Sequence, residues 1–202
     1  GGPDMIDGGD GDDTLNGGTG DDLMIGGSGA DALDGGEGVD TVSYLGALSP
    51  VTVSLDTELG TRGDANGDTL ANFEMLIGSG LPKEFGSVFA SGDILEGSTN
   101  LDTIYGMDGA DTIRGLAGND LIYGNHPDQP ESLIAGYDAD DINGGDGNDV
   151  IHGQGDDDKL DGGEGMDTLY GETGDDHLLT FDLLYPDILD GGEGTNRLSA
   201  DY

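Results

Sequence analysis

The chain has 202 residues, of which 44 are acidic, 5 are basic and none is cysteine, and its formal net charge is −39. Nucleic acid is excluded as a partner, because binding to phosphates needs a positively charged surface. Disulfide bonds are excluded too, and no stretch approaches the roughly 18 apolar residues of a membrane span. Leu, Ile, Val and Phe make up only 44 residues beside 42 glycines, so we expect the chain to need a bound ligand before it folds.

A nine-residue repeat runs through most of the chain, with the template G-G-x-G-x-D-x-U-x, where U is a large apolar residue. It fills residues 1–43 as a partial row and four complete rows, which we name block 1. The register is lost over the interruption 44–87 and returns as four rows over 88–123 (block 2). Residues 124–134 are expected to form a surface loop. Five rows follow over 135–179 (block 3), and residues 180–202 hold two terminal rows and a cap.

Two positions of the 16 rows hardly vary. The eighth position is apolar in every row, from Ile6 to Leu198. The sixth position is Asp in 15 rows, and Asn196 replaces it in the last, which composition alone does not produce. The sixth-position aspartates are Asp4, Asp13, Asp22, Asp31, Asp40, Asp93, Asp102, Asp111, Asp120, Asp140, Asp149, Asp158, Asp167, Asp176 and Asp187.

The repeat closely resembles the nonapeptide of the RTX (repeat-in-toxin, hemolysin-type) calcium-binding family, over about 140 of the 202 residues. The resemblance implies an all-β fold, a right-handed parallel β-roll (a β-helix-like solenoid) with Ca2+ bound between stacked turns. It also implies a secreted bacterial protein that crosses the cell envelope by type I secretion and folds on Ca2+ binding outside the cell. We expect the chain to be part of a longer extracellular parent protein with neighbouring domains.

The residues support the same fold independently. The last three positions of a row alternate polar, apolar and polar, which predicts a three-residue strand with one inward side chain. The first six positions are predicted to be turn rather than strand, because their glycines accept positive φ. A strand and a turn make half a coil, so two rows form one 18-residue coil. Residues 18 apart should then stack about 4.8 Å apart.

Stacked carboxylates repel one another, and a hard divalent cation between them reverses the sign. A flexible all-oxygen shell favours calcium over magnesium. We expect about eight Ca2+ ions, at the pairs Asp4/Asp22, Asp13/Asp31, Asp22/Asp40, Asp93/Asp111, Asp102/Asp120, Asp140/Asp158, Asp149/Asp167 and Asp158/Asp176. Second- and fourth-position carbonyls are the further expected ligands, at Gly9, Gly11, Gly18, Gly20, Gly27, Gly29, Gly36, Gly38, Gly109, Gly118, Gly145, Gly147, Gly163 and Gly165.

The interruption carries its own acidic residues. Residues 51–55 alternate as a strand, and Asp64-x-Asn66-x-Asp68 begins like an EF-hand loop. Thr69 replaces the glycine of that motif and Met75 its final glutamate. The favoured interpretation is therefore a solvated loop, with an irregular calcium site as the alternative.

Other chemistry finds little support in the sequence. It has no HExxH motif, G-x-S-x-G elbow or P-loop, so we expect this chain not to be an enzyme, whatever the parent protein does. Tyr105 and Tyr123 occupy ninth positions 18 apart and should stack on an outer sheet face. Two alternatives to the calcium-binding roll of a secreted protein stay open. One is an accessory module of an extracellular epimerase, lipase or protease, with a polysaccharide partner; the other is a spacer or adhesive segment of a surface protein.

Overall fold

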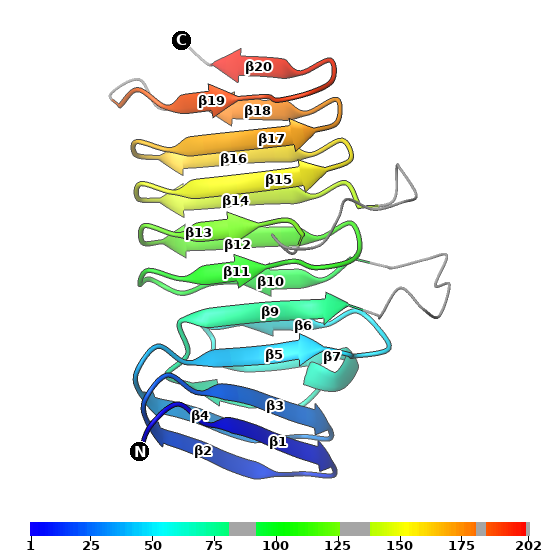
Figure 1. Ribbon diagram of the computed structural model, residues 1–202, viewed down its shortest axis with the longest axis vertical. Coiled ribbons are helices and arrows are strands. Elements are labelled where there is room, and N and C mark those ends of the chain that lie inside the picture. Colours follow the sequence, from blue (N-terminus) through cyan, green and yellow to red (C-terminus); the bar gives the residue numbers. More distant parts are fainter. Residues whose placement is uncertain (81–91, 126–137, 181–184, 201–202) are drawn as a thin grey trace.

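A computed structural model describes residues 1–80, 92–125, 138–180 and 185–200. The protein is a stack of flattened coils, each of which gives one strand to each of two facing sheets (Figure 1). The nine-stranded sheet has the order β1 (Met5–Asp10), β3 (Leu23–Ser28), β5 (Thr41–Leu45), β9 (Met75–Gly80), β11 (Thr103–Tyr105), β13 (Leu121–Tyr123), β15 (Val150–Gly155), β17 (Thr168–Thr173) and β19 (Ile188–Asp190).

The eleven-stranded sheet has the order β2 (Thr14–Thr19), β4 (Ala32–Glu37), β8 (Thr69–Ala71), β7 (Leu59–Arg62), β6 (Thr52–Ser54), β10 (Ile94–Glu96), β12 (Thr112–Ala117), β14 (Asp141–Asp146), β16 (Lys159–Glu164), β18 (His177–Thr180) and β20 (Arg197–Ala200). The described strands pair in parallel, except that β7 is antiparallel to both of its neighbours. This all-β parallel roll confirms the predicted fold class. No helix in the described part of the chain is long and apolar enough to cross a membrane.

The strand register confirms the 18-residue coil. Ile6 pairs with Met24 across β1 and β3, and Leu15 with Leu33 across β2 and β4. The same stack continues past residues 124–134, where Ile113 pairs with Ile142 at a separation of 29 rather than 18. The inserted residues therefore lengthen one coil without shifting the register of the coils that follow.

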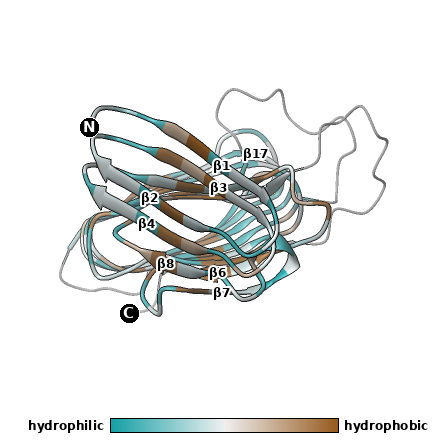
Figure 2. Cartoon of the chain, turned by 90° about the horizontal axis from the view of Figure 1, so that it is seen from below, coloured by the Kyte–Doolittle hydropathy of each residue, from teal (hydrophilic) through white to brown (hydrophobic). Residues whose placement is uncertain are grey.

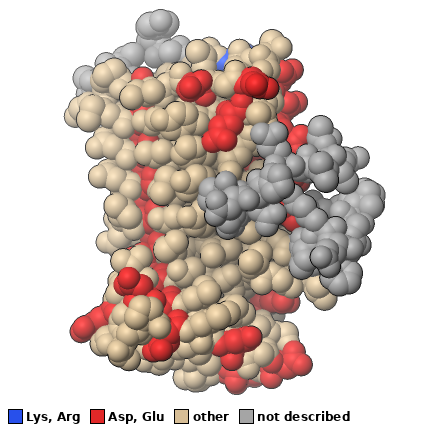
Figure 3. Space-filling model, in the orientation of Figure 1, with Lys and Arg blue, Asp and Glu red and all other residues tan. Residues whose placement is uncertain are grey.

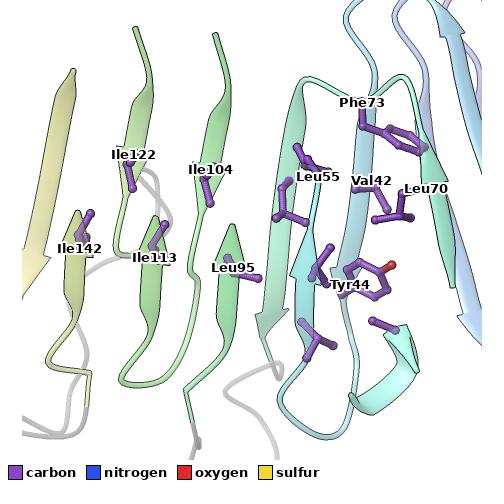
Figure 4. Packing of buried hydrophobic residues seen from close by; sticks show 14 of the residues in the cluster. Val42, Tyr44, Leu55, Leu70, Phe73, Leu95, Ile104, Ile113, Ile122 and Ile142 are labelled. Atoms are coloured by element: carbon purple, nitrogen blue, oxygen red, sulfur yellow. The ribbon is translucent and has the colours of Figure 1, made fainter. Parts of the chain in front are cut away.

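Eighth-position side chains form a narrow core between the sheets. They lie on the apolar segments of the strands (Figure 2), and from Met24 to Leu178 each is at most 2% exposed. Leu198, in β20 at the end of the described stack, is 58% exposed. The core widens beside the interruption, where Tyr44, Val53, Leu70 and Phe73 are buried together (Figure 4).

The prediction of three-residue strands is wrong for most complete rows. Strands such as β3 and β16 have six residues, which run from the seventh position of one row to the third position of the next. Alternation continues along them, so the first-position glycines Gly26 and Gly162 are buried and face inward. A methyl group added at Gly162 would lie 2.4 Å from Asp167 Oδ2. Only glycine leaves room there for the carboxylate of its own row.

The reversal of the chain falls at the second and fourth positions, which have positive φ. Gly9 has φ of 91° and Gly11 has φ of 116°. The same conformation is kept where the sequence departs from glycine, so the stack imposes it even at a steric cost. These non-glycine residues are Met107, Leu116, Gln154, Asp156 and Glu172.

Most of the described part of the interruption, residues 44–80, belongs to the roll. Strands β6, β7 and β8 insert into the eleven-stranded sheet between β4 and β10, and β9 joins the nine-stranded sheet. The EF-hand-like start does not form an EF-hand: Asp64 lies in a short 3-10 helix, Gly63–Ala65, and Asp68 is fully buried. The interpretation as a solvated loop is therefore wrong for Asp68. Parts of the predicted rows and loop, at 81–91, 126–137, 181–184 and 201–202, lie outside the described residues.

Candidate metal sites

The sixth-position aspartates form two columns along the edges of the roll. Acidic atoms lie in a line parallel to the long axis on one side of the molecule (Figure 3). From Asp22 to Asp176 these residues are at most 2% exposed, whereas the side chain of Asp4, at the end of the stack, is 55% exposed. Each turn curls around its own carboxylate and the neighbouring coils cover it. Such burial is rare for a carboxylate unless it is paired or binds a metal.

Each column is joined by hydrogen bonds from one coil to the next. The backbone N–H of Asp22 donates to Asp40 Oδ1 at 2.8 Å, and the N–H of Asp140 donates to Asp158 Oδ1 at the same distance. All eight pairs expected from the sequence are stacked in this way, at 2.7–3.0 Å. One oxygen of the accepting carboxylate in each pair therefore has a backbone partner.

The other oxygen, Oδ2, is different. Within the described residues, ten of these buried atoms accept no hydrogen bond: those of Asp13, Asp22, Asp31, Asp40, Asp111, Asp120, Asp140, Asp149, Asp158 and Asp176. We call them the bare oxygens. Leaving a charged oxygen buried without a partner costs more than about 1–3 kcal/mol. Ten such atoms indicate a group that the protein chain does not supply.

The surroundings of the bare oxygens indicate that the missing group is a proton donor or carries a positive charge. A methyl group added at Gly115 would lie 2.4 Å from Asp120 Oδ2 and 2.4 Å from the carbonyl oxygen of Gly144. Two hydrogen-bond acceptors thus face the same small space from neighbouring coils. Only a proton donor or a cation can make that arrangement favourable.

The last row confirms this requirement with a natural substitution. Asn196 holds the sixth position there, and its Oδ1 accepts the N–H of Asp176 at 2.8 Å, as an aspartate would. Its amide nitrogen donates to the Gly191 carbonyl at 2.6 Å. An N–H donor therefore occupies the place where the aspartate rows have a bare oxygen.

The electrostatics of the aspartate rows point the same way. Burial, with a further contribution from the charges of Asp120 and Asp167, raises the pKa of Asp149 to about 7. Burial likewise raises the pKa of Asp158 to about 8, with Asp176 adding to the effect. Without a cation the buried carboxylates can be neutralised only by protons, and near pH 7 that protonation is incomplete.

The residues fit calcium. Among the described residues no three His, Asp or Glu side chains converge as a site built of side chains alone would require. The available ligands are pairs of stacked carboxylates and the backbone carbonyls of the turns, an all-oxygen set that suits a hard, flexible cation such as Ca2+. Second-position glycines stack in the same register, as Gly9 over Gly27 and Gly145 over Gly163. Calcium bound there would neutralise the acceptors and join adjacent coils; the ligand roles of the individual carbonyls stay predictions.

Sequence periodicity missed two pairings between predicted members of the columns and two further members, Asp68 and Glu74. Asp111 donates its N–H to Asp140, and Asp120 to Asp149, both at 2.8 Å across a separation of 29. In the interruption, Asp68 Oδ1 accepts the N–H of Asp31 at 2.9 Å, and Glu74 Oε2 accepts that of Asp40 at 2.9 Å. The first two pairs had a signal, because the repeat restarts in full after 124–134, whereas Asp68 and Glu74 had none.

We expect the calcium-free roll to lose stability as the pH rises. The folded-state pKa values of Asp120, Asp149 and Asp158 are raised to about 6, 7 and 8, above the value of about 3.9 for an unfolded aspartate. The folded state then binds more protons, so its stability is full below about pH 4 and falls through pH 6–8. Thermal unfolding in calcium-free buffer should therefore give a lower midpoint at about pH 9 than at about pH 5. A midpoint that rises with pH would contradict the burial described here.

An aromatic column runs along the outer face of the nine-stranded sheet. Tyr105 and Tyr123 stack with ring centroids 5.1 Å apart, which confirms the predicted pair. The column continues through His152 and Tyr170, at 4.8 and 4.7 Å. The rings of Tyr123 and His152 each have stacked neighbours on both faces, so the column stabilises the sheet from outside.

A parallel roll with columns of buried, metal-requiring carboxylates defines a calcium-binding solenoid. The model of the RTX calcium-binding nonapeptide repeat matches residues 1–42, 90–125, 134–166 and 161–180. These segments make up well over half of the chain, which therefore belongs to this family, and its repeats are calcium-binding repeats. No curated protein is significantly similar to the chain in sequence.

Proposed function

We propose that this chain is the calcium-binding roll of a secreted bacterial protein, unfolded inside the cell and folded by Ca2+ outside it. The observation that carries the proposal is the set of ten bare oxygens, all buried in turns and eight of them with a backbone carbonyl of the next coil close by. A chain that must bury these charges in order to fold cannot do so readily until a cation is present.

Cytosolic calcium is far below the Kd of about 10⁻⁴–10⁻³ M that is typical of extracellular calcium modules. Most of a roll of this affinity would stay unfolded before and during type I secretion and would fold at millimolar calcium outside. Binding of an ion to the folded state alone stabilises that state by mass action, so calcium acts as the folding signal. The chain itself is proposed to be non-catalytic, with the activity of the parent protein in neighbouring domains.

A polysaccharide-contacting role has weaker support. Sugars bind tyrosine through the face of the ring, and the rings of the aromatic column are stacked on one another at 4.7–5.1 Å. The faces of the inner rings are therefore covered by their neighbours. This arrangement favours a structural role for the column over a glycan platform.

The proposal is tested by far-ultraviolet circular dichroism of the full chain. In chelator we expect most of the β signal to be absent, and calcium should restore it cooperatively at about 10⁻⁴–10⁻³ M. Magnesium should substitute poorly, because it prefers near-ideal octahedral geometry and releases its water reluctantly. A complete β spectrum in chelator, unchanged by calcium, would refute calcium-driven folding.

A further inference from the structure

Three aspartates in the middle of the columns differ from those with bare oxygens, because the protein itself supplies donors to their Oδ2 atoms. Asp187, near the C-terminal end of the stack, is also supplied, by the Thr180 hydroxyl. The hydroxyl of Tyr44 donates to Asp68 Oδ2 at 3.0 Å. At Asp93 the donor is Ser79, whose N–H reaches Oδ2 at 2.6 Å and whose hydroxyl reaches Oδ1 at 2.8 Å. Neither Asp68 Oδ2 nor Asp93 Oδ2 needs a cation to be satisfied.

Asp102 repeats this arrangement with a serine of its own row. Ser98 donates to Asp102 Oδ2 through its N–H at 2.6 Å and through its hydroxyl at 2.9 Å. Ser98 occupies the second position of its row, where most rows have glycine. A departure from the template therefore has a structural reason: the serine brings a donor to the carboxylate that the turn encloses.

These three residues lie together in the stack. Asp68 and Asp93 stand between Asp31 and Asp111 in one column, as the bonds Asp31 to Asp68 and Asp93 to Asp111 indicate. In the other column Asp102 precedes Asp120. Both columns thus change from metal-requiring to self-satisfied carboxylates in the same part of the roll, around β5 to β11.

The same part of the roll has the widest apolar core. Elsewhere the core is a single file of residues such as Ile113, Ile122 and Ile142, whereas Tyr44, Leu55 and Phe73 broaden it beside the interruption (Figure 4). Val51, Val53, Ala65, Leu70 and Leu76 are also at most 2% exposed. A region with more buried apolar surface depends less on metal binding for its stability.

We propose that calcium occupies two separate arrays, one ending at Asp40 and one beginning at Asp111, and that Tyr44, Ser79 and Ser98 replace the metal between them. This assignment rests on the proposed function. It removes the expected pairs Asp93/Asp111 and Asp102/Asp120, because Asp93 and Asp102 are already satisfied. It adds Asp111/Asp140 and Asp120/Asp149, in which both members have a bare oxygen.

The division has a consequence for folding. The described parts of the central segment, residues 41–80 and 92–105, keep their structure without calcium. The two arrays assemble on them from either side when the ion is supplied. The segment provides both sheets with a finished coil on which the next coil can stack. This avoids the slow formation of a first coil from a disordered, strongly charged chain.

Hydrogen–deuterium exchange of the full chain, read by mass spectrometry of its peptides, tests the proposal. In chelator, peptides from 41–79 and 92–105 should stay protected, while those from 8–36 and 140–178 should exchange at the rate of an unfolded chain. Added calcium should protect the two flanking regions and change the central one little. Uniform loss of protection in chelator, with calcium restoring all regions together, would overturn the two-array proposal and leave the proposed function intact. Protection of every region in chelator would contradict both.

Variants test whether the hydroxyls are responsible. Tyr44→Phe removes the donor to Asp68 and keeps the ring, so exchange of the central segment in chelator should rise about tenfold to hundredfold. Ser98→Ala should act in the same direction at Asp102. Tyr123→Phe is the matched control, because its ring lies in the outer column, and it should leave central exchange unchanged. Equal exchange in Tyr44→Phe and Tyr123→Phe would overturn the role given to Tyr44.

Discussion

Alanine in place of Asp158 should raise the calcium concentration at the folding midpoint by about 3- to 30-fold, which corresponds to about 0.7–2 kcal/mol. Asp158 accepts the N–H of Asp140 at 2.8 Å and donates its own N–H to Asp176 Oδ1 at 3.0 Å. These two bonds place it in two stacked pairs. It is also 2% exposed and has a bare oxygen. Its loss weakens both pairs. Asp22 has the same position in the first array, and Asp22→Ala should behave alike.

The controls remove the same charge from outside the columns. Asp10 is exposed in the third position, and its carboxylate accepts the hydroxyl of Ser28 at 2.8 Å. Asp34, at a ninth position, bonds Asn16 and Asn72 at the surface. Asp10→Ala and Asp34→Ala should leave the midpoint unchanged or slightly lower, because they reduce repulsion. Equal effects from all four variants in a calcium titration would mean that a diffuse acidic atmosphere binds the ion.

Asparagine in place of Asp158 should stabilise the calcium-free fold, whereas alanine should not. The last row provides the model, since Asn196 accepts the N–H of Asp176 and donates to the Gly191 carbonyl. Asp158→Asn keeps the acceptor for Asp140, places an N–H donor near the Gly153 turn and removes a charge that costs free energy when buried. We expect fewer bound ions and a more stable fold in chelator.

Two measurements on the same sample separate these effects. Native mass spectrometry should count fewer calcium ions on Asp158→Asn than on the unsubstituted chain. Hydrogen–deuterium exchange in chelator should give more protection of residues 140–178 in Asp158→Asn than in Asp158→Ala. If the asparagine and alanine variants exchange alike without calcium, the place opposite the glycine carbonyl does not require a donor, and Asn196 is not a valid model.

Much of the roll could be predicted from its sequence, because the residue types within each nine-residue row indicate which side chains face inward and which stack. The eighth-position residues point inward and the sixth-position aspartates stack, as the register Ile6 to Met24 and the bond from Asp4 to Asp22 demonstrate. Strand length was not predictable in the same way. A first-position glycine such as Gly26 carries no side chain from which its inward direction could be inferred, although it continues the strand.

The interruption could not be predicted because it satisfies the same physical needs with other residues. A neighbouring coil requires only an acceptor at the right height, and Asp68 and Glu74 supply it at separations of 37 and 34. Those separations are not multiples of the coil length. Tyr44 and Ser79 likewise reach the carboxylates through tertiary packing, which leaves no periodic mark in the sequence. Of these residues only Ser98 could have been identified from the sequence, because it is a serine at a position where the repeat template has glycine.

Anomalous diffraction from crystals grown with calcium tests the central claim most directly, because it locates the ions. Peaks should lie about 2.3–2.6 Å from sixth-position carboxylate oxygens, in one array up to Asp40 and a second from Asp111 onward, with none at Asp68, Asp93 or Asp102. Peaks confined to exposed acids such as Asp10 and Asp12, with none beside the bare oxygens, would contradict the account.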